Sequence, residues 1–111
     1  MTTTYKRLGA IDGNGTIGTA STLYTVPAST STVVSTITIC NTSATTATFS
    51  IAASTTTSFV TAGYIVNQSS IPGNETIGLT FGLTLDATNK YLLASSSAST
   101  VVFSAFGSEI S

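Results

Sequence analysis

The acidic side chains of this 111-residue chain lie far apart in the sequence. They are Asp12, Glu75, Asp86 and Glu109. Calcium loops draw several carboxylates from one short segment, whereas here no two acids lie within three residues of each other. We therefore expect Asp12 and Asp86 to form turns by bonding nearby backbone groups. We expect no bound metal and no other cofactor.

The possible nucleophiles have no base beside them. The chain has no histidine, which removes Ser-His-Asp and Cys-His catalysis and histidine zinc sites. Cys40 ends a β-branched run with no cation near it in the sequence, so we interpret it as a small, partly buried apolar side chain. Lys6 and Lys90 could activate a hydroxyl, but no catalytic motif surrounds them. We expect no enzyme and no catalytic residue.

Four tyrosines are the remaining groups that could recognise a ligand. They are Tyr5, Tyr24, Tyr64 and Tyr91, and the chain has no tryptophan. The positions of Tyr24 and Tyr91 favour packing at the edge of a core, where one end of the ring stays polar. A glycan-binding platform, with Tyr64 or Tyr91 in an exposed loop, remains an alternative.

Charged residues are scarce along the whole chain. They make up 6% of the residues, against about 25% in ordinary soluble domains, and the formal net charge is −1. The chain therefore lacks a basic footprint for nucleic acid. It contains 24 Thr and 17 Ser, so hydroxyls largely replace ions. Because so little charge gives little colloidal repulsion, we expect other subunits to cover much of the surface.

The apolar residues are dispersed among these hydroxyls. No run approaches the ~18 apolar residues of a membrane helix. The first eight residues have no apolar segment behind Lys6 and Arg7, so we expect no secretory signal. We expect a protein made in the cytoplasm, with no membrane partner.

Alternation with a period of two indicates the elements that carry these residues. In residues 75–85 apolar side chains alternate with Thr and Gly, which is typical of a strand with one buried face. Gly78 and Gly82 indicate a bulge, a bend or the close approach of another backbone. Residues 33–40 carry β-branched side chains on both faces, which is typical of a strand well inside a sheet. There we predict Val33, Ile37 and Ile39 on one face.

Further strands are predicted on the same grounds. In residues 46–52 we expect Ala47, Phe49 and Ile51 to point inward, and in residues 101–106 Val101, Phe103 and Ala105 lie opposite Val102, Ser104 and Phe106. Shorter candidate strands are residues 22–26, 59–66 and 90–94.

Turn signals separate the strands. Residues 12–15 form one tight turn, and residues 71–74 predict a type II turn centred on Pro72 and Gly73. Seven or eight short strands without a helical stripe predict an all-β, single-domain antiparallel β-sandwich, either Ig-like or jelly-roll. We predict that residues 1–20 form either an N-terminal arm that docks on a neighbour or an edge segment of the sheet. Residues 21–111 are predicted to form the sandwich domain.

Five phrases follow one another along nearly the whole chain. They are Tyr5-Lys-Arg-Leu-Gly9, Thr22-Leu-Tyr-Thr-Val-Pro-Ala28, Val33-Val-Ser-Thr-Ile-Thr-Ile-Cys-Asn41, Ser70-Ile-Pro-Gly-Asn-Glu-Thr-Ile77 and Val102-Phe-Ser-Ala-Phe-Gly-Ser-Glu-Ile110. In this order and spacing they resemble small virion structural proteins of tailed bacteriophages, cyanophages among them. The resemblance implies a β-sandwich present in many copies on the particle. It implies no catalytic residues, and it leaves the station on the virion open.

We therefore expect a non-enzymatic protein of the virion, a capsid decoration or cement protein. Its partners would be the major capsid protein or other virion proteins, and it would bind as a homo-oligomer, with a trimer favoured. Neutral hydroxyls can bond to a lattice without the cost of desolvating ions. The alternatives are a neck, tail or fibre-associated component and a receptor- or glycan-binding module.

Overall fold

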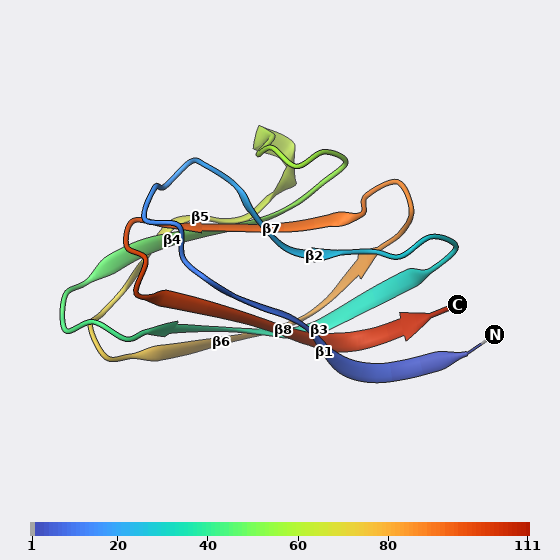
Figure 1. Ribbon diagram of the computed structural model, residues 1–111, viewed down its shortest axis with the longest axis horizontal. Helices are drawn as coiled ribbons and strands as arrows, with labels where there is room; N and C mark the ends of the chain where they lie inside the picture. Colours follow the sequence, from blue (N-terminus) through green and yellow to red (C-terminus); the bar gives the residue numbers. More distant parts are fainter. Residues whose placement is uncertain (1) are drawn as a thin grey trace.

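Alternating apolar and hydroxyl side chains build two sheets whose apolar faces meet (Figure 1). A computed structural model describes residues 2–111, except for the side chain of Phe81. One sheet has the order β1-β8-β3-β6 and the other β2-β7-β4-β5. The strands described are β1 (Thr3–Asp12), β2 (Ser21–Thr25), β3 (Ser31–Asn41), β4 (Ala47–Ser54), β5 (Tyr64–Ile71), β6 (Thr76–Leu85), β7 (Tyr91–Ser96) and β8 (Val101–Ile110), with one 3-10 turn, η1 (Thr61–Gly63).

The strand order is that of a jelly roll. β1 pairs with β8, β2 with β7, β3 with β6 and β4 with β5, and all of these pairs are antiparallel. This pattern arises when a long antiparallel hairpin is rolled so that its strands alternate between two sheets. The predicted all-β antiparallel sandwich is confirmed, and the strand order selects the jelly roll over the Ig-like arrangement. No helix in residues 2–111 is long and apolar enough to cross a membrane.

The core lies between the two sheets. Phe49 of β4 and Phe103 of β8 meet edge-on at its centre, with ring centroids 6.4 Å apart. The inward side predicted for residues 46–52 is confirmed, because Ala47, Phe49 and Ile51 are all buried, and of the two sides predicted for residues 101–106 the one with Phe103 is buried. Other fully buried aliphatic side chains are Val34, Ile37, Ile39, Ile51, Ile71, Leu92 and Leu93.

A bulge in β3 overturns the predicted face of Val33. Between Val34 and Thr36, β3 carries one residue more than β8, and this extra residue, Ser35, reverses the alternation of the side chains. Val34 is therefore the residue that joins Ile37 in the core, and Val33 lies on the opposite face. The prediction for Val33 was wrong because it assumed a strand without interruption.

The two glycines of β6 have different surroundings. β6 carries an extra residue between Thr80 and Leu83, so Gly82 lies in a bulge, as the sequence indicated. Gly78 pairs in register with Thr38. A Cβ atom added at either glycine would meet no atom of the chain within 4 Å. Close approach by another part of the same chain therefore explains neither glycine.

Two local predictions are corrected. The positive φ of the turn after β5 falls on Asn74, at 57°, and not on Gly73 as a type II turn centred on Pro72 and Gly73 requires. Gly73 is needed for a different reason, because a Cβ there would collide with the backbone of Ala44. The strand predicted at residues 59–66 begins only at Tyr64, after η1, and continues to Ile71.

The N-terminal segment belongs to the sandwich. Residues 3–12 form β1, an edge strand that pairs with β8, with a bulge between Arg7 and Gly9. Residues 13–20 connect β1 to β2, and Gly15 and Gly18 have positive φ in this loop. The sequence allowed either a docking arm or an edge segment for residues 1–20. Residues 3–12 agree with the edge segment.

Candidate functional site: the outer face of one sheet

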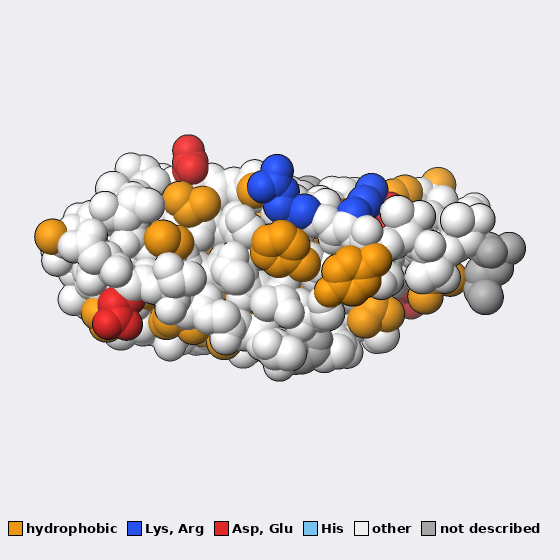
Figure 2. Space-filling model, turned by 90° about the horizontal axis from the view of Figure 1, so that it is seen from below, with side chains coloured by type: hydrophobic (Ala, Val, Ile, Leu, Met, Phe, Trp, Pro, Cys, Tyr) orange, Lys and Arg blue, Asp and Glu red, His pale blue; other side chains and the backbone are white. Residues whose placement is uncertain are grey.

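The β1-β8-β3-β6 sheet turns a face with few charged residues away from the core. Figure 2 shows this face from below: most side chains are neutral, large hydrophobic ones lie near the middle, and basic ones lie toward one long border. Its residues are half-buried or exposed. Strand pairing arranges them in three rows across the sheet, Arg7–Phe106–Thr36–Thr80, Ala10–Ser104–Thr38–Gly78 and Asp12–Val102–Cys40–Thr76.

Tyr5 lies on the same face, one row beyond Arg7. It pairs with Ser108 in the sheet, and 72% of its surface is exposed. Its hydroxyl lies 3.2 Å from Oγ of Ser35, which donates to the backbone oxygen of Phe106 at 3.2 Å. Tyr and Arg are the residues that most often anchor protein interfaces, and fixing a ring beforehand lowers the entropy lost on binding. Tyr5 is therefore a preformed anchor, and Arg7 and Phe106 lie in the next row of the same face.

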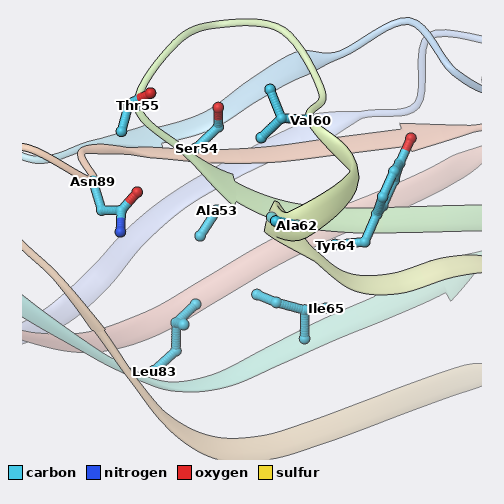
Figure 3. Close-up of a pocket in the computed structure, with 10 residues that line it drawn as sticks. Ala53, Ser54, Thr55, Val60, Ala62, Tyr64, Ile65, Leu83 and Asn89 are labelled. Atoms are coloured by element: carbon cyan, nitrogen blue, oxygen red, sulfur yellow. The ribbon is translucent and has the colours of Figure 1, made fainter.

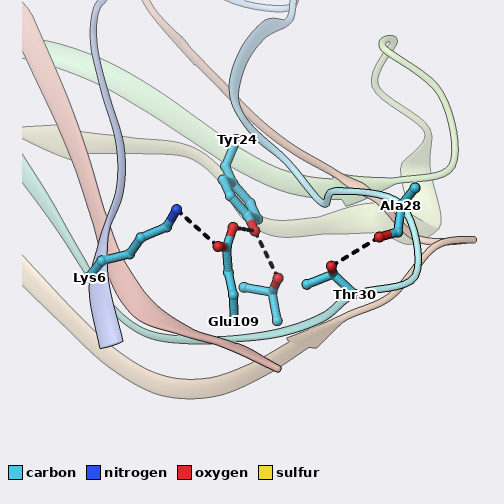
Figure 4. Close-up of polar contacts among 6 residues, drawn as sticks. Lys6, Tyr24, Ala28, Thr30 and Glu109 are labelled. Carbon is cyan, nitrogen blue, oxygen red and sulfur yellow. Dashed lines mark hydrogen bonds and ion pairs between the residues drawn. The ribbon is translucent and has the colours of Figure 1, made fainter. Parts of the chain in front are cut away.

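A polar cluster joins the two sheets where β2 lies beside β1 and β8 (Figure 4). The hydroxyl of Tyr24, a buried residue of β2, donates to Oε2 of Glu109 at 2.5 Å and lies 2.8 Å from Oγ1 of Thr32. Nζ of Lys6 lies 2.9 Å from Oε1 of the same carboxylate. Each oxygen of Glu109 therefore has its own partner.

This environment shifts the pKa of both acids in the cluster. Burial, followed by the hydrogen bond to Glu109, raises the pKa of Tyr24 to about 12. The hydrogen bonds from Tyr24 and then from Lys6 hold the pKa of Glu109 below its usual value. The cluster therefore stays ionised at Glu109 and neutral at Tyr24 around neutral pH, which is the state that stabilises the contact between the sheets.

An open cleft of about 400 Å³ lies on the other side of the sandwich, between β5 and β6. Ile65 of β5 and Leu83 of β6 extend toward each other across it (Figure 3). Val60 also lines the cleft, and Val60 and Ile65 are 47% and 39% exposed. Asn89 is a polar residue of its wall. The cleft is a shallow apolar site, and no charged residue is among those that line it in the described part of the chain.

The acidic residues singled out in the sequence lie in different parts of the fold. Asp86 forms a turn as predicted: its Oδ1 accepts the backbone N–H groups of Thr88 and Asn89, both at 2.9 Å. These bonds, that of Asn89 first, lower its pKa. Asp12 ends β1, and the turn-forming bond after it belongs to Asn14, whose Oδ1 accepts the N–H of Thr16 at 3.0 Å. Residues 2–111 contain no group of three potential metal ligands.

The tyrosines do not gather into one platform. Tyr24 is buried, as expected, and Tyr5 lies on the outer face of the other sheet. Tyr64 begins β5 and stacks on Phe59, with ring centroids 5.1 Å apart. Tyr91 begins β7, and Nζ of Lys90 lies 5.3 Å from its ring centroid. The four side chains therefore occupy four separate environments.

Sequence reasoning missed the cluster around Glu109 and the cleft at Leu83. One signal for the cluster was present, because Glu109 shares the inward positions of β8 with Phe103 and Ala105, and a charged residue there needs a partner. The cleft had no such signal, since it depends on how far β5 lies from β6. Cys40 is half-buried on β3, and Lys6 is paired with Glu109.

No protein-family model matches the chain, and no curated protein matches it significantly.

Proposed function

We propose that this protein is a non-enzymatic structural component of a bacteriophage virion, a decoration protein that binds the capsid lattice in many copies. The observation that carries the proposal is the outer face of the β1-β8-β3-β6 sheet, whose three rows contain two charged residues, Arg7 and Asp12. A face of this kind is suited to contact with other protein subunits. The phage assignment comes from the resemblance of the sequence to small virion proteins.

The chemistry of the face suits a permanent contact. Thr36, Thr38 and Ser104 offer neutral hydroxyls, which can exchange water for protein partners at less cost than ions. Phe106 supplies aromatic area within the three rows, and Tyr5 supplies more one row beyond them. The jelly roll recurs in viral capsid and lectin domains. That recurrence is an analogy of fold and supports the proposal only as such.

The partner is the major capsid protein or another virion protein, bound by a small symmetric oligomer of this chain. A neck, tail or fibre-associated component would use the same kind of surface. The two stations differ in number, because a lattice repeats its binding site over the whole shell, whereas a neck or tail offers few sites.

The test is the copy number per particle, measured by quantitative mass spectrometry of purified virions against the major capsid protein. A number comparable to that of the capsid protein supports decoration. A small fraction of that number overturns decoration in favour of the neck or tail. Absence from purified particles overturns the virion role.

A second candidate function is glycan binding at the cleft between β5 and β6. The observation that favours it is an aromatic ring and an amide, Tyr64 and Asn89, on the wall of one open cleft. A glycan array on the purified protein tests it, with Tyr64→Ala as the variant that should lose the signal. An array without signal at high protein concentration removes this function.

A further inference from the structure

We propose that the outer face of the β1-β8-β3-β6 sheet binds the same face of a second copy of this chain across a two-fold axis. The axis lies along the row Ala10–Ser104–Thr38–Gly78, across the strands. This proposal uses the same face as the proposed function, so the pair must dissociate before the face binds another virion protein. It concerns the free protein and does not require a virion.

The charges of the face are arranged symmetrically about this row. Arg7 lies in the row on one side and Asp12 in the row on the other side, both on β1. Each of these rows is two residues from the middle row along β8 and β3. A two-fold rotation about the middle row therefore brings Arg7 of one copy opposite Asp12 of the other, and the pair occurs twice. Charge complementarity of this kind specifies a partner and its orientation.

The uncharged residues match under the same rotation. Phe106 of one copy lies opposite Val102 of the other, which places apolar area against apolar area. Thr80 lies opposite Thr76, so hydroxyl meets hydroxyl near the β6 edge. The contact is isologous, in which the same patch serves both copies and association stops at the pair.

Three of the four residues in the middle row have small side chains, and the fourth is Thr38, whose hydroxyl would meet that of its own copy at the axis. A residue at the axis meets its own copy, so Ala10, Ser104 and Gly78 let the two sheets approach. Gly78 is otherwise unexplained: its φ is not positive, and a Cβ there would meet nothing of its own chain within 4 Å. By contrast, a Cβ at Gly107 would collide with the backbone of Val33. Since glycine weakens a strand and often marks the approach of another backbone, the second copy supplies the missing reason at Gly78.

The part of the face that the rotation overlaps has the size of a weak, transient contact. Four strands about 4.8 Å apart give a width of roughly 19 Å. The middle row lies nearer one end of the strands, so only about six residues of each strand, roughly 20 Å, lie opposite the same stretch of the second copy. This overlap would bury about 400 Å² on each copy and about 800 Å² in total, below the range of stable interfaces, so we expect a pair that forms at high protein concentration and dissociates on dilution.

Analytical ultracentrifugation of the full chain tests the pairing. We expect the natural sequence to form a dimer at high protein concentration and to dissociate to a monomer on dilution. Arg7→Asp and Asp12→Arg should each place like charges together and raise the dissociation constant at least about tenfold. The double variant, Arg7→Asp with Asp12→Arg, should restore the dimer because the pairs are exchanged. The control is Lys90→Glu, outside the three rows, which changes the net charge as much as Arg7→Asp and should leave the dimer intact.

A second variant separates the pairing from folding. Gly78→Val gives β6 a residue that strands prefer and should raise the melting temperature of the monomer, while its side chain blocks the axis and abolishes the dimer. A natural protein that stays monomeric at the highest concentration or forms a trimer, or a double variant that fails to recover, overturns the pairing. The copy number on virions is an independent measurement. If the free protein is a monomer but is abundant on particles, only the pairing is overturned. If the free protein is a dimer but is absent from particles, only the virion role is overturned.

Discussion

The two long sides of the sandwich join the same two sheets by different means. On the side of β1 and β2, Glu109 bonds Tyr24 and Lys6, so polar groups connect the sheets (Figure 4). On the side of β5 and β6, the apolar side chains Ile65 and Leu83 line an open cleft (Figure 3). One side depends on a few directional bonds, and the other on apolar side chains that remain partly in water.

This difference predicts unequal sensitivity to substitution. Glu109 is a partly buried carboxylate, and if it loses a partner it is left with a less well paired charge, which costs more than the bond itself. An apolar side chain that is already 39% exposed, such as Ile65, loses little when it is replaced. The polar side should therefore limit the stability of the domain, and the cleft should tolerate change.

The largest effect is expected for Tyr24→Phe. This variant keeps the ring but removes the hydroxyl that bonds Glu109 and Thr32, and it should lower the free energy of unfolding by about 1–3 kcal/mol. The matched variant Tyr64→Phe, at the cleft, should change it by less than about 0.5 kcal/mol. Urea denaturation followed by circular dichroism measures both. Equal effects at the two sites would remove the contrast between the two sides.

The second prediction concerns acid. The pKa of Glu109 is lowered in the folded protein from its ordinary value of 4.5, so its contribution to stability is complete above that pH and is lost as the pH falls through the folded value. The melting temperature should therefore drop below about pH 4.5. Glu109→Gln should melt lower at neutral pH and lose less on acidification. Because the pKa of Asp86 is also lowered, the comparison should be repeated with Asp86→Asn, and an unchanged acid response in Glu109→Gln would contradict the prediction.

The smallest effect is expected at the cleft itself. Ile65→Ser should lower the free energy of unfolding by at most about 1 kcal/mol, because 39% of Ile65 is already exposed and only the covered part of its apolar surface is lost. The measurement is the same urea titration. A loss of several times this size would indicate that the cleft is closed in solution, and it would make the two sides alike.

Local pattern was sufficient for most of the strands and for some of their inward positions. The alternation around Phe49 predicted which residues are buried, and the alternation around Phe103 predicted two opposite sides, of which the structure buries one. It failed at Val33, because the extra residue Ser35 shifts β3 relative to β8 and no local signal distinguishes it from its neighbours. The turn at Gly73 failed in a similar way, since its glycine is required by Ala44, a residue distant in the sequence.

The candidate face could not be predicted from sequence. Arg7, Phe106, Thr36 and Thr80 form one row although they are distant from one another along the chain. The sequence by itself determined the all-β class, the scarcity of charge and the absence of histidine chemistry. Tertiary structure decided the jelly-roll order, the bulges, the Glu109 cluster and the symmetric placement of Arg7 and Asp12 about a row of small residues. The physical reason is that alternation records only which side of a strand is buried, whereas register and strand order depend on pairing between distant segments.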